Sequence, residues 1–164
     1  MIKNMGPNKG GKYKQNFFTP KNPEKYHGDL DKIIFRSSWE SRFMVWCDLN
    51  PVVKKWSSEP IGIPYISPLD KKYHTYYVDF WVLIEKNGIK QQYLVEVKPN
   101  SQTKPPSPKL CATVNEGAAT AAQLKRYNRE LRTYIINQTK FKSATRYATE
   151  RGMIFKVADE SFLF

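Results

Sequence analysis

Cysteine is scarce in this sequence, with Cys47 and Cys111 as the two cysteines among 164 residues. Two cysteines cannot build a disulfide framework, and no cluster of Cys and His has the spacing of a zinc site. The sequence also lacks a run of about 18 apolar residues and an apolar N-terminal stretch, as a membrane span or a secretory signal would need. We therefore expect no membrane association and a reducing cytoplasm, with Cys47 as a small core residue.

Acidic residues are few relative to basic ones, with 15 Asp and Glu against 27 Lys and Arg. The formal net charge is +12 and the sequence pI is about 9.7. Such an excess favours a polyanionic partner, and nucleic acid is the first expectation. The alternative is a basic protein without such a partner. A hydrophobic content of 40% in 164 residues predicts one folded domain with a substantial core.

The first thirty residues are rich in Gly, Asn, Lys and Pro. We predict a basic flexible arm over residues 1–30 and the folded domain over residues 31–164. The arm could follow DNA phosphates, dock on a partner or remain a solvated tail. Its aromatic residues predict that its later part packs on something; they are Tyr13, Phe17, Phe18 and Tyr26.

A β-hairpin is predicted in the middle of the chain. Residues 75–84 and 91–97 are dense in β-branched and aromatic side chains. Between them lies Asn87-Gly88, the dipeptide that best tolerates the positive φ angles of a type I′ turn. If these two residues form the loop, Lys86 faces Ile89, and the register of the whole hairpin follows.

In this register Asp79 faces Glu96, and Lys98 shares the same face of the sheet. Two facing carboxylates in apolar surroundings repel each other unless a positive charge lies between them. Their hard oxygen atoms suit Mg²⁺, and the Lys98 ammonium could stabilise charge on a phosphate or orient a water. The alternative is a buried ion pair that only neutralises itself.

A helix should begin at Ser37, which forms a capping box with Glu40, and end at Asn50-Pro51. Glu40 therefore has a structural explanation in capping its own helix. Residues 52–66 predict one or two edge strands.

Thr113 and Glu116 form a second predicted capping box, which opens a helix to about Ile136. Another helix is predicted over residues 140–151, with Gly152 at its C-terminal end. A final strand is predicted over residues 153–158. This order of elements gives an α/β fold with a mixed central β-sheet flanked by helices.

Gln123 and Tyr127 share one face of the helix that follows the hairpin. Lys125 and Arg126 add basic charge to it. This charge could contact DNA phosphates or form a solvated face, and Tyr127 could equally lie in the core with Gln123 beside it.

Asp79, the hairpin and Glu96-Val97-Lys98 together resemble the restriction-endonuclease-like PD-(D/E)xK nuclease core, although Val78 replaces the usual proline. The segments that carry a closer resemblance are KNPEKYHGD, IIFRSSWESRFMVWCDLNP, KWSSEPIGIPYISPLD, YYVDFWV and EVKP. They resemble the head completion nucleases of T4-like tailed phages, which share features with a phage and transposon endonuclease branch.

The resemblance implies a Mg²⁺-dependent DNA nuclease, with Mn²⁺ as a substitute. Asp79 and Glu96 would hold the ion, the Val97 carbonyl would complete the set, Glu40 would be an outer or additional ligand, and Lys98 would orient or deprotonate the attacking water. In the RecB-like nucleases, residues spaced as Gln123 and Tyr127 lie near the metal and DNA.

The implied setting is virion assembly in the host cytoplasm, with retention in the virion as an open possibility. The substrate would be the packaged double-stranded phage genome, cut or trimmed before head–tail joining, and head, portal or neck proteins would be partners. One alternative is a non-catalytic DNA-binding connector with a degenerate nuclease fold. Another is a sequence-specific restriction-type or transposition endonuclease.

Overall fold

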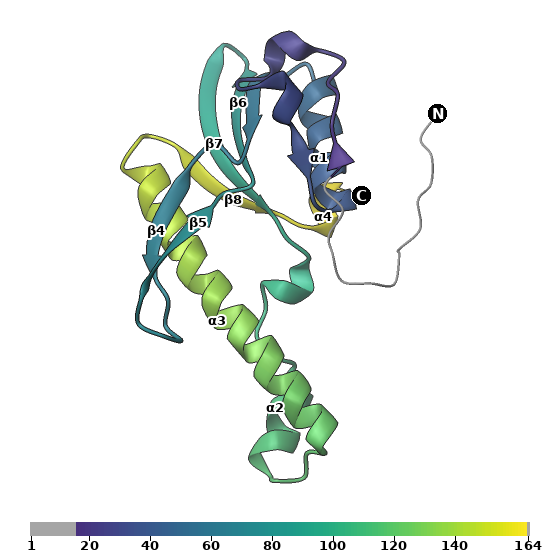
Figure 1. Ribbon diagram of the computed structural model, residues 1–164, viewed down its shortest axis with the longest axis vertical. Coiled ribbons are helices and arrows are strands. Elements are labelled where there is room, and N and C mark those ends of the chain that lie inside the picture. Colours follow the sequence, from purple (N-terminus) through teal and green to yellow (C-terminus); the bar gives the residue numbers. More distant parts are fainter. Residues whose placement is uncertain (1–15, 164) are drawn as a thin grey trace.

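The computed structural model describes residues 16–163 of the chain. Figure 1 shows a body built around a β-sheet, from which α2 and the first half of α3 project. The strands are β1 (Asn16–Phe17), β2 (Ile34–Phe35), β3 (Val53–Ser58), β4 (Gly62–Ile66), β5 (Tyr73–Tyr77), β6 (Phe80–Lys86), β7 (Ile89–Val97) and β8 (Ile154–Ala158). The α-helices are α1 (Ser38–Leu49), α2 (Pro108–Asn115), α3 (Ala121–Thr149) and α4 (Glu160–Leu163), and short 3-10 helices are η1 (Pro23–Lys25), η2 (Leu30–Lys32) and η3 (Asn100–Gln102).

The main sheet has four strands in the order β3-β6-β7-β8. β6 pairs antiparallel with both β3 and β7, whereas β7 and β8 are parallel. A separate two-stranded ribbon is formed by β4 and β5. This mixed α/β architecture, with helices on the sheet, confirms the predicted fold class.

Each face of the main sheet is covered by a different helix, because successive side chains of a strand point to opposite faces. On one face Phe43, Met44 and Cys47 of α1 pack with strand residues that include Val82 and Val95. On the other face Ala144 and Ala148 of α3 pack with Leu94 and with the β4–β5 ribbon. The core position predicted for Cys47 is confirmed, since its side chain is fully buried.

The hairpin register is confirmed. Lys86 pairs with Ile89, and Asn87 and Gly88 have φ values of 53° and 77°, as a type I′ turn requires. The predicted first strand is not continuous, however. It divides at Val78-Asp79 into β5 and β6, because residues 73–77 pair with β4 and leave the main sheet.

Helix α1 begins as predicted, with Ser37 as its N-cap. The predicted capping box at Thr113 is wrong, because Ser107 caps α2 and Gly117, at φ 71°, lies just beyond its end. The next helix starts with Thr120 as N-cap and runs without interruption to Thr149, so the two helices predicted after residue 113 are largely one. Gly152, at φ 67°, follows its end as expected.

The described part of the predicted arm is packed onto the domain. Asp48 of α1 is 2% exposed and accepts hydrogen bonds from the backbone amides of Lys21 at 2.7 Å and Asn22 at 3.0 Å. Phe18 and Tyr26 contact the Trp56 ring edge-on, whereas Phe17 is exposed. Residues 16–30 therefore belong to the folded domain, while the rest of the predicted arm, with Tyr13, lies outside the described residues.

Among residues 16–163, no helix combines the length and the apolar character that crossing a membrane requires.

Candidate active site

The candidate site lies where the β6–β7 ladder ends. Regular pairing stops at Phe80 and Val95, one pair before the predicted pair of Asp79 and Glu96. The backbone amide of Val97 instead donates a 2.8 Å hydrogen bond to Oδ2 of Asp79. The Asp79 carbonyl also accepts a hydrogen bond from the Glu59 amide at 2.8 Å, so Asp79 is held at both its backbone and its side chain.

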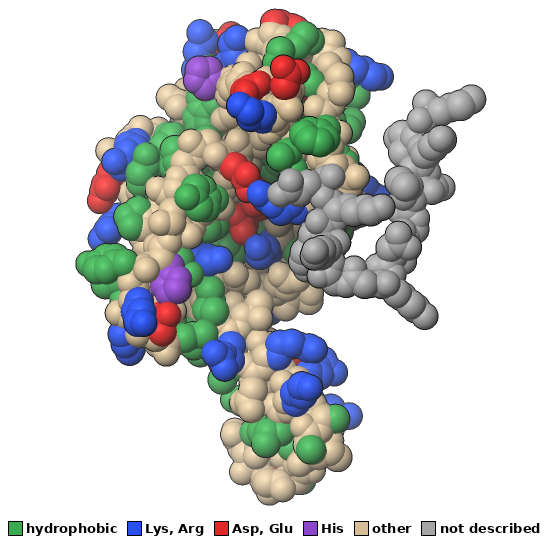
Figure 2. Space-filling view, in the orientation of Figure 1, with side chains coloured by type: hydrophobic (Ala, Val, Ile, Leu, Met, Phe, Trp, Pro, Cys, Tyr) green, Lys and Arg blue, Asp and Glu red, His purple; other side chains and the backbone are tan. Residues whose placement is uncertain are grey.

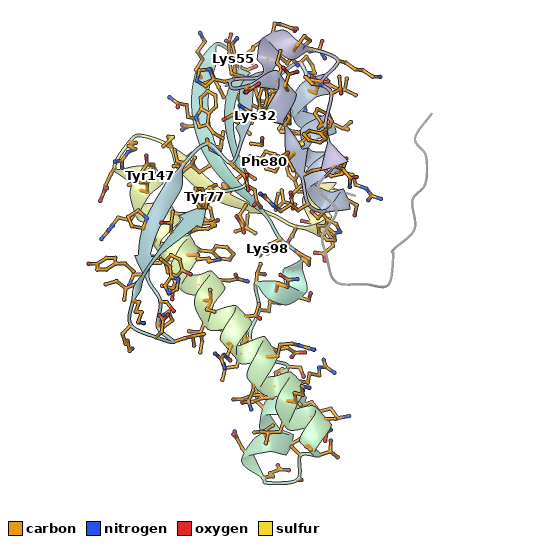
Figure 3. The ribbon with its side chains drawn as sticks, in the orientation of Figure 1. Lys32, Lys55, Tyr77, Phe80, Lys98 and Tyr147 are labelled. Atoms are coloured by element: carbon orange, nitrogen blue, oxygen red, sulfur yellow. The ribbon has the colours of Figure 1, made fainter. Side chains whose placement is uncertain are left out.

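Glu96 is the buried acid of the site, at 3% exposure. Its Oε1 accepts a hydrogen bond from Nζ of Lys98 at 2.8 Å, which confirms that the two residues share a face. Its Oε2 accepts a hydrogen bond of 2.5 Å from the hydroxyl of Tyr76 on β5. Figure 3 places Lys98 at the end of the sheet, close to the point where the chain continues toward the projecting helices.

The electrostatics show that the two carboxylates interact. Burial, followed by the charge of Glu96, raises the pKa of Asp79 well above its ordinary value, and the Val97 hydrogen bond and Lys98 oppose this only in part. Burial alone would lower the pKa of Lys98, but Glu96, Asp79 and Glu40 together raise it. Lys98 is therefore an ammonium at neutral pH.

Glu40 is engaged in capping its own helix. Its Oε1 accepts a hydrogen bond from the Ser37 hydroxyl at 2.8 Å, and its Oε2 accepts one from the Arg36 amide at 2.9 Å. Its charge still raises the pKa of Asp79, so it lies within electrostatic reach of the site. Over residues 16–163 there is no group of three Asp, Glu, His or Cys close enough to hold one ion, so Glu40 is not placed as a third direct ligand.

The donor set at Asp79 and Glu96 nevertheless fits a divalent cation. Mg²⁺ characteristically takes one or two protein carboxylates and fills its other positions with water and substrate phosphate. Burial and the nearby charge of Glu96 both raise the pKa of Asp79, and a cation between the two carboxylates would offset both effects. Both oxygens of Glu96 already accept hydrogen bonds, and each keeps a further lone pair for an ion.

Gln123 and Tyr127 lie in the first two turns of α3, away from the Asp79 and Glu96 carboxylates, and their DNA-binding role stays a prediction. The Gln123 side chain accepts a hydrogen bond from the Thr120 amide at 2.8 Å and so completes the capping box of α3. Lys140, the residue of α3 whose pKa responds to Glu96 and Asp79, lies 17 residues further along, which is about 25 Å of helix. Lys125 and Arg126 are exposed on the same projecting part of α3.

The fold brings to the site two residues, Tyr76 and Arg36, whose place there no local sequence pattern predicts. Tyr76 is one of three tyrosines within residues 73–77, and no position among them stands out. Arg36 forms an ion pair with Glu59, which raises its pKa most, with further contributions from the charges of Glu40 and Asp79. Both depend on the departure of β5 from the main sheet and on the β3–β4 connection, which no local pattern specifies.

Two comparisons with known proteins found similarity. The family model described as TnsA-like endonuclease N terminal matches residues 50–160, a span that contains Asp79, Glu96 and Lys98 but not Glu40. The chain is also 36% identical over 146 residues to a protein of Enterobacteria phage T4 named head completion nuclease, covering 89% of this chain and 91% of that protein. No solved structure matches.

Proposed function

Since the chain belongs to the TnsA-like endonuclease N-terminal family, we propose that it is a Mg²⁺-dependent deoxyribonuclease of phage head completion. The observation that carries this proposal is the gathering of Asp79, Glu96 and Lys98 at the end of the β6–β7 ladder. The substrate is the packaged double-stranded genome, which the protein cuts or trims before head–tail joining. The setting is the host cytoplasm, with head, portal or neck proteins as partners.

In this proposal Asp79 and Glu96 hold the ion, Mg²⁺ or in its place Mn²⁺, which supplies positive charge that polarises the phosphate and activates water. The Val97 amide orients Asp79 and the Tyr76 hydroxyl orients Glu96, so that neither carboxylate has to reorganise when DNA binds. The Val97 carbonyl stays a predicted ligand, and Glu40 acts through its charge as an outer group.

Lys98 has the role of a fixed cation in this chemistry. Because its pKa is raised, it reaches the substrate as an ammonium rather than as a base. It can donate a hydrogen bond to a non-bridging phosphate oxygen or orient the attacking water. Water attacks phosphorus, the bond from phosphorus to one ester oxygen breaks, and the two DNA ends carry a phosphate and a hydroxyl.

DNA binding is assigned to the basic surface of the chain. The formal net charge of +12 provides the general attraction to phosphates. The projecting part of α3 would contact the duplex away from the site of cleavage, through Lys125, Arg126, Gln123 and Tyr127.

The test is incubation of supercoiled plasmid with the protein in Mg²⁺, in Mn²⁺ and in EDTA. We expect nicked, linear or shortened DNA with either metal and intact plasmid in EDTA. Asp79→Ala and Lys98→Ala should abolish cutting while DNA binding persists. Glu85→Ala is the matched control, because Glu85 lies on the same hairpin in an ion pair with Lys90 at 3.9 Å, away from the ladder's end.

A wild-type protein that leaves plasmid uncut with both metals would overturn the proposal. Full assembly activity of Asp79→Ala would then identify the chain as a non-catalytic connector that keeps only the fold. The remaining alternative is a sequence-specific restriction-type or transposition endonuclease. Sequencing of the DNA ends distinguishes it from the proposed function, since a sequence-specific enzyme produces defined ends.

A further inference from the structure

Lys140 is a half-buried lysine in the second half of α3. Its Nζ lies 5.8 Å from the centre of the Tyr65 ring and 5.4 Å from the centre of the Tyr76 ring. These tyrosines come from β4 and β5, so the ammonium lies between the ribbon and the helix. Within residues 16–163 its side chain makes no ion pair and no hydrogen bond.

The same tyrosine connects Lys140 to the carboxylates. The Tyr76 ring holds the ammonium, and the Tyr76 hydroxyl donates to Oε2 of Glu96. Burial lowers the pKa of Lys140 most and the charge of Lys98 lowers it further, while the charges of Glu96 and Asp79 oppose this. Lys140 therefore lies close enough to the site to sense all three of its charged residues.

A purely structural role does not account well for this lysine. Cation–π contacts act within about 6 Å of the ring centre and are worth about 0.5–1 kcal/mol at exposed sites, and both contacts here are near that limit. Taking an ammonium partly out of water without a counter-ion works against them. An arriving anion would remove that penalty. Figure 2 shows basic and acidic side chains together in the recessed centre of this face.

We propose that Lys140 is a substrate-binding residue that contacts a phosphate of the DNA backbone at the cleavage site. The inference rests on the proposed nuclease function. It adds to the active site a DNA-binding residue from α3 and the two tyrosines of the β4–β5 ribbon that contact it. Tyr65 and Tyr76 hold the ammonium in place before DNA arrives, which lowers the conformational entropy lost on binding.

The experiment compares Lys140→Met, which keeps the apolar stem, with Lys140→Arg, which keeps the charge. Lys142→Met is the matched control, because Lys142 is exposed on the same helix and residues two apart do not share a face. Two measurements are made for each protein: steady-state kinetics on a DNA duplex in Mg²⁺, which give KM, and the salt dependence of duplex binding in EDTA. A thermal melt of each variant confirms that it is folded.

We expect Lys140→Met to raise KM roughly tenfold, as the loss of one charged hydrogen bond predicts. The slope of log K against log salt should fall in magnitude by about 0.9, the value for one phosphate contact. Lys140→Arg should restore both quantities, and Lys142→Met should change neither. Wild-type KM and salt slope in Lys140→Met, or equal losses in Lys142→Met, would overturn the inference.

The two proposals can fail separately. If the wild-type protein does not cut DNA, the nuclease function fails, while the salt slope still decides whether Lys140 contacts a phosphate. If the wild-type protein cuts and Lys140→Met matches it in both quantities, the nuclease function stands and the role of Lys140 does not. Should Lys140→Met melt at a lower temperature than the wild-type protein, Lys140→Gln replaces it in both measurements.

Discussion

The backbone amide of Val97 is hydrogen-bonded to the side chain of Asp79, at 2.8 Å, rather than to a neighbouring strand. In the hairpin register the residue opposite Val97 would be Val78, but the chain leaves the sheet at that point to form the β4–β5 ribbon. The carboxylate takes the position of the missing backbone acceptor. The end of the ladder therefore holds the Asp79 carboxylate at Val97, the residue that directly follows Glu96 in β7.

Replacing Asp79 with Asn should separate activity from stability. Cleavage in Mg²⁺ should fall by at least about two orders of magnitude, since one of the two carboxylates is lost. Without divalent ions the melting temperature at pH 8 should rise, because Asn can still accept the Val97 amide and carries no charge beside Glu96. Differential scanning calorimetry and a plasmid assay measure the two effects.

The sign of the pH dependence follows from the raised pKa of Asp79. Folding favours its protonated form, so the charged form destabilises the wild-type protein as pH rises from 3.8 through the folded pKa. The stability gain of Asp79→Asn should be largest above that folded pKa and vanish below 3.8. Mg²⁺ should raise the melting temperature of the wild-type protein more than that of the variant. A gain that does not change with pH would contradict this account.

Tyr76→Phe tests whether the hydroxyl orients Glu96. The variant keeps the ring but removes the 2.5 Å hydrogen bond to Oε2, so a buried carboxylate loses one of its donors. Outer partners of metal ligands typically contribute 10–100-fold to metal affinity or activity. We expect the Mg²⁺ concentration for half-maximal cleavage to rise by roughly 10-fold. Tyr77→Phe, at an exposed position, is the control, and equal Mg²⁺ titrations for both variants would contradict the role.

Local turn and cap chemistry made the hairpin and the start of α1 predictable. Asn87-Gly88 specifies its register through backbone conformation, and Ser37 begins α1 through one side-chain hydrogen bond. The resulting placement of Glu96 and Lys98 on one face followed from the alternation of a strand. The break at Val78-Asp79 was not predictable, because it depends on pairing with β4.

The helical half of the chain shows the opposite case. Thr113 and Glu116 satisfy the pattern of a capping box, but Gly117 takes a positive φ value directly after them and the helix ends there. Because the next helix starts at Ala121 instead, Gln123 lies in its first turn and far from the site. A spacing of four residues fixes which helix face two side chains share, but not where along the helix the site lies.

Lys125 and Arg129 test the DNA-binding role of the projecting helix. They are four residues apart, share a face and are both exposed. The double variant Lys125→Gln, Arg129→Gln should weaken duplex binding and reduce the salt slope by about 1.8, the value for two phosphate contacts. The rate at saturating DNA should not change, because the site is remote. Arg146→Gln, at the other end of α3, is the control, and an unchanged salt slope in the double variant would contradict the assignment.

Asp48→Ala measures how much the packing of residues 16–30 on α1 stabilises the domain. The buried Asp48 carboxylate accepts the amides of Lys21 and Asn22, and both donors lose a charged acceptor in the variant. Hydrogen bonds to charged groups contribute about 1.5–3 kcal/mol each in favourable cases. We expect the free energy of unfolding to fall by about 2–4 kcal/mol in urea titrations, with one cooperative transition retained. Asp29→Ala, which removes an exposed acceptor from the same segment, should lower it much less than Asp48→Ala does. If Asp48→Ala lowered the free energy of unfolding no more than Asp29→Ala does, the packing of residues 16–30 would contribute little to the stability of the domain.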